Sequence, residues 1–346
     1  MVRFARGFQK ALPLGLMILA AACDSRFPLT EWPIEDQTVE HEIGNSGGEF
    51  QQYTGAPYFH EGIDIRDEDA PAGPWVINVR EGTVTTVVEN PGSLYNGVIV
   101  TASDGDQYVY WHLVDIQPDV DDAFNNGTVL PAGTQMAQLV TWTACTYHHL
   151  HYEVADAQGS REPILTIAPR EDLTSPIVIW VSLVENATNT VMPNNAIGLP
   201  IVSGEVDIVA HAYDTQFGAA RTGVLELRWF VEDTSNNVVV PEVVMSFRDI
   251  PPDSAAVDAF RNSAPFDSDS NYCATENYYY VPTNVDASGA IIADATGSWD
   301  TTTLANGTYF VHVTAEDQWG QRFHAHPASD GRQLEAPDPP TAPGGL

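Results

Sequence analysis

Between residues 46 and 172 the chain consists of short apolar runs separated by turn residues. The separators include Asn-Pro-Gly at 90–92, Asp-Gly at 104–105 and Asn-Gly at 126–127, which are typical of tight turns. No stretch sustains a 3.6-residue period, so the pattern predicts an antiparallel, all-β domain. The expected strands are rich in valine, isoleucine, threonine and tyrosine and cover residues 75–79, 82–88, 97–101, 107–112, 135–140 and 150–154.

A second region, residues 173–330, also predicts β structure, because apolar and polar residues alternate over 177–184, 205–213, 225–232 and 308–316. Ser-Gly-Glu-Val-Asp-Ile at 203–208 and Asn-Gly-Thr-Tyr at 306–309 resemble motifs of bacterial immunoglobulin-like domains, which implies a β-sandwich. The polar stretch 251–297 is interpreted as an insertion in that sandwich. Residues 331–346 are Pro- and Gly-rich and predict a disordered tail.

The first 22 residues have the pattern of a signal peptide: Arg3, Arg6 and Lys10 precede a short apolar run and three alanines. Small residues directly before Cys23 resemble a bacterial lipobox, which implies a lipid on the Cys23 thiol and a tether over 23–45. We therefore expect a protein anchored at the bacterial cell envelope, facing the periplasm or the exterior, with the lipid as its only membrane contact. Plain secretion is the alternative, because Ala20 stands where a lipobox usually has leucine.

The chain carries 47 acidic and 14 basic residues, for a formal net charge of −33. Such a surface repels nucleic acid and anionic lipid, so neither is an expected partner. Adaptation to a salty medium is the simplest interpretation of the acidity. Export would place Cys145 and Cys273 in an oxidising compartment, where they could pair as a disulfide or remain as two small buried residues.

Three histidine-containing segments of the first domain carry the candidate chemistry. They are His-Glu-Gly-Ile-Asp at 60–64, Tyr-Trp-His-Leu at 110–113 and His-Leu-His-Tyr-Glu at 149–153. Imidazole and carboxylate groups suit Zn²⁺, and a catalytic zinc site has three protein ligands with a fourth position for water. His149 and His151 are two residues apart on a predicted strand, so both rings project from one face. His324 and His326 form a similar pair without a nearby HxxxD and are interpreted as surface residues.

Taken together and in this order, the three segments resemble the LytM/lysostaphin-type zinc metallopeptidases over residues 46–170. The resemblance implies that His60, Asp64 and His151 bind zinc. It implies a zinc-dependent endopeptidase that hydrolyses peptide cross-links or bridges of bacterial peptidoglycan. A water molecule activated by zinc would attack the amide, with His149 as general base and His112 stabilising the oxyanion.

The sequence departs from this family beside the expected groove. The family has a turn of small residues before its His-x-His motif, whereas this chain has Thr-Trp-Thr-Ala-Cys-Thr-Tyr-His at 141–148. His148 alternates away from His149, so we expect it to face solvent or a turn. The alternative function is a catalytically idle module that binds cell wall or activates a hydrolase while keeping its zinc site.

Overall fold

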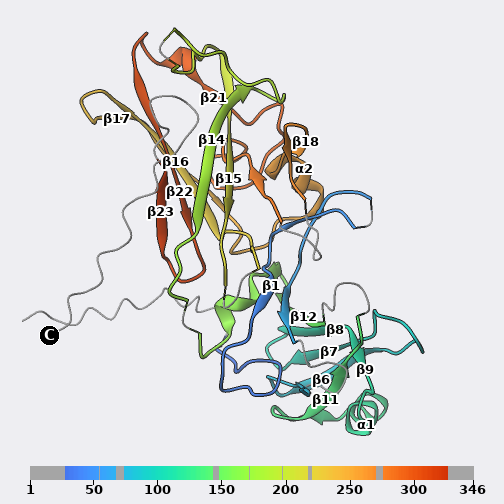
Figure 1. Ribbon diagram of the computed structural model, residues 1–346. Helices are drawn as coiled ribbons and strands as arrows, with labels where there is room; N and C mark the ends of the chain where they lie inside the picture. Colours follow the sequence, from blue (N-terminus) through green and yellow to red (C-terminus); the bar gives the residue numbers. More distant parts are fainter. Residues whose placement is uncertain are drawn as a thin grey trace, which may run out of the picture.

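The computed structural model describes residues 28–53, 55–67, 74–142, 148–170, 172–196, 198–216, 220–269 and 276–325. These residues form two β-rich domains stacked end to end (Figure 1). Each domain has a hydrophobic core of its own. The all-β fold class expected from the sequence is confirmed. Among the described residues, no helix has the length and apolar character needed to span a membrane.

An antiparallel sheet of eight strands forms the centre of the first domain. Its order is β1 (Ile43–Asn45), β4 (Ile63–Arg66), β12 (His149–Asp156), β8 (Gln107–Trp111), β7 (Gly97–Ala102), β6 (Gly82–Val88) and β10 (Val129–Leu130), with β13 (Gly159–Arg161) beside β12. A smaller sheet has the order β5 (Val76–Ile77), β11 (Gln135–Leu139) and β9 (Leu113–Val114).

Alternation along the central strands divides the large sheet into an apolar and a polar face. On β12, Leu150, Tyr152 and Val154 are fully buried in the core, so His149 and His151, which alternate with them, lie on the other face. The helix α1 (Pro118–Asn126) is an element that the sequence pattern does not predict. It is short, starts with Pro118, buries only Val120 and Ala123, and so shows little helical periodicity.

The second domain is a sandwich of two antiparallel four-stranded sheets. One contains β14 (Ile177–Glu185), β15 (Glu205–Tyr213), β20 (Tyr279–Tyr280) and β21 (Trp299–Asp300). The other has the order β17 (Val238–Ser246), β16 (Glu226–Asp233), β22 (Tyr309–Glu316) and β23 (Arg322–Ala325). Residues of both sheets share one core, for example Ile208 with Trp229 and Val313. The immunoglobulin-like assignment and the domain limits stay predictions.

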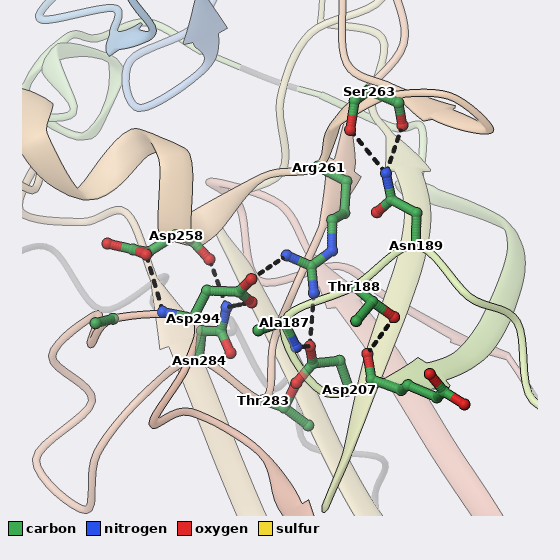
Figure 2. Close-up of polar contacts among 12 residues, drawn as sticks. Ala187, Thr188, Asn189, Asp207, Asp258, Arg261, Ser263, Thr283, Asn284 and Asp294 are labelled. Atoms are coloured by element: carbon green, nitrogen blue, oxygen red, sulfur yellow. Dashed lines mark hydrogen bonds and ion pairs between the residues drawn. The ribbon is translucent and has the colours of Figure 1, made fainter.

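The segment 251–297 contributes to the sandwich core as well as to its surface. It contains α2 (Ala256–Ala259), the hairpin of β18 (Asn262–Ser263) and β19 (Phe266–Asp267), and the core residues Phe260 and Tyr278. Figure 2 shows how its polar groups attach it to β15: Arg261 donates to Asp207 at 2.5 Å and to Asp294 at 2.6 Å. Asp207 is fully buried, so this ion pair fixes the segment to the sheet.

A hairpin of the first domain inserts into the core of the second. It consists of β2 (Phe50–Gln51) and β3 (Tyr58–Phe59), which pair with each other. Phe50 packs edge-on against Phe260 with ring centroids 5.6 Å apart, and Phe59 lies 5.9 Å from Phe247. In the opposite direction, Trp319 of the sandwich packs against the core of the first domain. The two domains therefore interlock through side chains that each lends to the other.

Candidate metal centre and active site

Strand pairing brings the three expected ligands together. β4 and β12 are antiparallel neighbours, and their register places Asp64 directly opposite His151. His60 follows β3 and is 3% exposed, and Asp64 is 6% exposed. Gly62 between them lies so close to β12 that a Cβ atom there would be 2.4 Å from the carbonyl oxygen of Tyr152. The glycine of the His-Glu-Gly-Ile-Asp segment therefore permits the close approach of the ligand-bearing strands.

Three donor atoms converge at this point. Nε2 of His60 lies 3.1 Å from Oδ1 of Asp64 and 2.9 Å from Nδ1 of His151, and this Nδ1 lies 3.1 Å from the same Oδ1. In a tetrahedral zinc site with bonds of about 2.0–2.2 Å, ligand atoms are roughly 3.3–3.5 Å apart. The observed separations are within a few tenths of an ångström of that spacing, so the residues fit a zinc ion.

The outer nitrogens of the two histidines have acceptors of their own. Nδ1 of His60 donates to the carbonyl oxygen of Ser46 at 2.9 Å, and Nε2 of His151 donates to Oε1 of Glu153 at 3.0 Å. With those protons in place, the lone pairs of His60 Nε2 and His151 Nδ1 both point into the site. Outer acceptors of this kind orient metal-binding histidines and increase their basicity.

The electrostatics of the site favour positive charge. Burial alone would raise the pKa of Asp64, but His149, His60 and hydrogen bonds from two histidines hold it well below its usual range. Burial alone would lower the pKa of His151, yet its hydrogen bonds with Asp64 and Glu153 raise it to about 10. The two carboxylates thus stabilise either a proton on His151 or a cation at the same place.

His149 and His112 border the three ligands. His149 begins β12 and is 5% exposed, with Nε2 3.7 Å from Oδ2 of Asp64. His112 follows β8, and its ring centroid lies 4.5 Å from that of His149. The backbone of His112 is left-handed, with φ of 69°, which is uncommon for a residue other than glycine and is frequent at functional sites. The structure therefore brings all five residues singled out in the sequence into one site.

The protonation of His112 is set by its surroundings. Its Nδ1 donates to the carbonyl oxygen of Leu94 at 2.7 Å. Burial, followed by the charges of His149 and His151, lowers the pKa of His112 to about 3. The ring is accordingly neutral at physiological pH, and Nε2 is its unprotonated nitrogen.

Two aromatic side chains, which the sequence motifs do not assign, border the histidine pair. Trp142 lies 5.0 Å from His112 and 5.1 Å from His149 between ring centroids. Tyr95 lies 5.6 Å from His112 and is 65% exposed. An exposed aromatic ring beside the site is available to contact a ligand.

One part of the expectation for this region is wrong. His148, which directly precedes β12, does alternate away from His149, but it is buried and does not face solvent. The His148 side chain is 7% exposed, and its Nδ1 accepts a hydrogen bond from the backbone nitrogen of Trp142 at 2.8 Å. Cys23, Cys145 and Cys273 lie outside the described residues, so the lipid anchor and the disulfide stay predictions.

Comparison with known proteins gives the family of the first domain. Residues 58–163 match the model of Peptidase family M23. This region is an M23 peptidase domain. The match includes all five site residues and ends at Pro163, just after β13. No curated protein sequence matches the chain at a significant level.

Solved structures similar to the chain include lysostaphin from Staphylococcus simulans, described as an antimicrobial peptidase. Its catalytic domain is 18% identical over 36% of this chain and 90% of its own, with a TM-score of 0.28. The whole protein is 12% identical over 85% of this chain and 92% of its own, with a TM-score of 0.30. A complex of SpoIIIAH and SpoIIQ is 18% identical over 39% and 97% of the two chains, with a TM-score of 0.29. The assignment of the M23 domain rests on the sequence match.

Proposed function

We propose that the M23 domain is a zinc-dependent endopeptidase that hydrolyses peptide cross-links or bridges of bacterial peptidoglycan. The observation that carries this proposal is the convergence of His60 Nε2, Asp64 Oδ1 and His151 Nδ1 within 3.1 Å of one another. The family match over residues 58–163 supports peptide hydrolysis as the reaction. Peptidoglycan as the substrate comes from the resemblance of the motifs to the LytM/lysostaphin type.

The neighbouring histidines supply the proton transfers. Zinc held by the three ligands would provide Lewis-acid chemistry and a water acidified to a pKa of about 7. Since His112 is neutral with Nε2 unprotonated, it is suited to accept a proton. His149, with Nε2 3.7 Å from Oδ2 of Asp64, also borders the ligands, and we assign it to stabilise the developing oxyanion or leaving amine. This division is the reverse of the one expected from the sequence.

The surroundings of the site suit an extended peptide chain. Tyr95 and Trp142 stand edge to face, 6.2 Å apart, beside the two histidines. Their rings would pack against the backbone or side chains of a peptide bound across the site. Bulk at this point, where the family has small residues, would restrict which peptide bond reaches the metal.

The signal-like sequence at the N-terminus supports a proposal for where the protein is located. We propose cleavage before Cys23 and a lipid on its thiol, which would hold the domain at the cell envelope within reach of the wall. We also propose an immunoglobulin-like identity for the sandwich. Mass analysis of the mature N-terminal peptide tests the anchor, since an unmodified cysteine or another cleavage site would contradict it.

Metal analysis and digestion of peptidoglycan test the enzymatic proposal. The purified protein should release soluble fragments from peptidoglycan and bind one zinc in the M23 domain, which Asp64→Ala should lose. His112→Ala and His149→Ala should each keep that zinc and lose about 10²–10⁴-fold in turnover. A zinc-loaded protein with no turnover on any peptidoglycan or bridge peptide would instead support the idle-module alternative.

A further inference from the structure

Three buried aspartates meet at the end of the sandwich that faces the M23 domain. Asp172 lies in the linker between the domains, Asp214 directly follows β15, and Asp317 directly follows β22. Their exposures are 8%, 1% and 0%. One oxygen from each lies within 4.8 Å of an oxygen of the other two. Segments more than 40 residues apart thus place three carboxylates around one buried point.

The carboxylates of Asp172 and Asp317 each accept hydrogen bonds through only one of their two oxygens. Oδ1 of Asp172 accepts from the backbone nitrogen and hydroxyl of Thr174 at 2.8 and 2.6 Å. Oδ1 of Asp317 accepts from the backbone nitrogens of Trp319 and Gln321, both at 2.8 Å. These bonds fix the orientation of the carboxylates and leave Oδ2 of each buried without a hydrogen-bond partner.

The third carboxylate and its neighbours add further oxygens. Asp214 is only 1% exposed, and neither of its oxygens has a hydrogen-bond partner of normal geometry, although the backbone of Thr215 and the side chain of Gln216 lie close enough to oppose the rise in its pKa. Oε1 of Gln216 and the hydroxyl of Thr222, which forms a backbone bridge with Asp214, are also buried without a partner. Buried polar atoms in native proteins are otherwise almost always paired, so the group lacks a positively charged partner.

No basic side chain within the described part of the chain supplies that partner. None of the ion pairs found among the described ranges includes Asp172, Asp214 or Asp317. Burial, together with the charge of Asp172, raises the pKa of Asp317 to about 7, although backbone hydrogen bonds oppose the shift. Three like charges in this space are costly without a cation, because desolvation and repulsion act together.

We propose that Asp172, Asp214 and Asp317 form a calcium site distinct from the zinc centre. Every available ligand atom is an oxygen, whereas zinc prefers nitrogen and sulfur ligands, so the site does not suit zinc. Calcium takes six to eight oxygens in flexible geometry and binds carboxylates directly, whereas magnesium retains several waters. The three aspartates are at most 8% exposed, which leaves little room for the waters that magnesium would retain, so the site suits calcium better.

The location gives the site a structural role at the domain junction. The amide of Gln321 donates to the carbonyl oxygen of Asp172 at 2.7 Å, which already joins the linker to the β22–β23 turn. Trp319 from that turn packs against the core of the M23 domain. Calcium would fasten the linker, β15 and β22 to one another, and so hold the sandwich in its position against the M23 domain.

Calcium titration of the full-length protein tests the proposal. The protein is stripped with EDTA, reloaded with one equivalent of zinc, and followed by calorimetry and thermal melting. We expect one calcium per chain and a Tm rise of about 5 °C or more at 1 mM, as for a Kd near 10 µM, with magnesium at least about tenfold weaker. Absence of binding at 1 mM, or equal binding of magnesium, would overturn the proposal.

Variants separate this site from general effects on folding. Asp214→Asn/Asp317→Asn should abolish the calcium response yet melt no lower than wild type in EDTA, because two repelling charges are gone. Asp286→Asn, on an exposed turn of the sandwich, should keep the full response. Asp64→Ala should lose zinc and keep calcium binding, so this result does not depend on the proposed peptidase function. A calcium response that survives in the double variant would place the ion elsewhere.

Discussion

Glu153 offers a way to measure how much the surroundings of the metal site contribute to zinc affinity. Its Oε1 accepts from Nε2 of His151 at 3.0 Å, and its side chain is 14% exposed. Burial alone would raise the pKa of Glu153, but the hydrogen bond and charge of His151 and the charge of His60 lower it. The group is therefore ionised at neutral pH, and it would act on a bound metal through the imidazole of His151.

Glu153→Gln removes the charge and keeps the shape and one acceptor oxygen. Loss of an outer partner of a metal-binding histidine typically costs 10–100-fold in metal affinity, or about 1.4–2.7 kcal/mol. We expect a value near the lower end, because the glutamine oxygen can still accept the proton of His151 Nε2. Glu153→Leu, which also removes the acceptor, should lie near the upper end.

Competition with a fluorescent zinc chelator at pH 7 measures these affinities. The control is Glu61→Gln. Glu61 lies next to His60 in sequence, and its burial and the nearby charge of Glu153 raise its pKa. Among the described residues, no hydrogen bond to a ligand histidine accompanies that shift. The control should change affinity less than about threefold. Equal zinc affinities for wild type, Glu153→Gln and Glu153→Leu would refute the role assigned to this carboxylate.

Three further predictions concern stability. Gly62→Ala should push β4 away from β12, lower the free energy of unfolding by about 1–3 kcal/mol and weaken zinc binding. Gly307→Ala should have none of these effects, because a Cβ atom there meets only ordinary van der Waals contacts. Equal denaturation curves for the two variants would contradict this prediction. Burial raises the pKa of Glu162 from 4.5 to about 8. Its contribution to the free energy of unfolding is therefore complete below pH 4.5 and declines as pH rises through 8, with a loss of about 3 kcal/mol at pH 7. Glu162→Gln should flatten urea stability between pH 5 and 8, and an unchanged slope would count against the shift. Arg261→Met should cost about 3–5 kcal/mol in urea unfolding, because its fully buried aspartate partner loses its charge pair, and a loss below 1 kcal/mol would refute that.

Local spacing carried most of the information about the candidate metal centre. His60 and Asp64 are close in sequence, and His149 and His151 must share a strand face, so short motifs were enough to predict which residues come together. Glu153 lies on that same face two residues further along β12, but its hydrogen bond to His151 depends on side-chain geometry. The same limit explains His148, because alternation indicates opposite faces without indicating which one is buried.

Long-range features could not be predicted in this way. Asp172, Asp214 and Asp317 share no motif, and only the ends of β15 and β22 bring them to the linker. The insertion of Phe50 and Phe59 into the sandwich core likewise has no signal in the hydrophobic pattern, which shows that residues are buried but not in which domain. The short helix α1 escaped because nine residues with two buried positions barely establish a period.

The hairpin that crosses the domain boundary also leads directly into the candidate metal centre. Phe59, whose ring is buried in the sandwich, is followed directly by His60. The nearby carboxylate of Glu49 accepts hydrogen bonds from two groups of the sandwich, the backbone nitrogen of Gly223 at 2.8 Å and the hydroxyl of Tyr278 at 2.7 Å. It also accepts one from the backbone nitrogen of Ser46, and the carbonyl oxygen of Ser46 orients His60.

Metal binding and the folding of the sandwich are consequently linked thermodynamic events. Zinc that binds only the native arrangement would stabilise both domains together. Any loosening of the sandwich would, for the same reason, weaken zinc binding. An M23 fragment cut at the linker would expose two phenylalanines and leave the buried Glu49 without its two partners in the sandwich. The candidate metal centre of this chain thus depends on groups outside the family domain, and exchange of its sandwich for another module would have to replace the contacts that hold Glu49, Phe50 and Phe59.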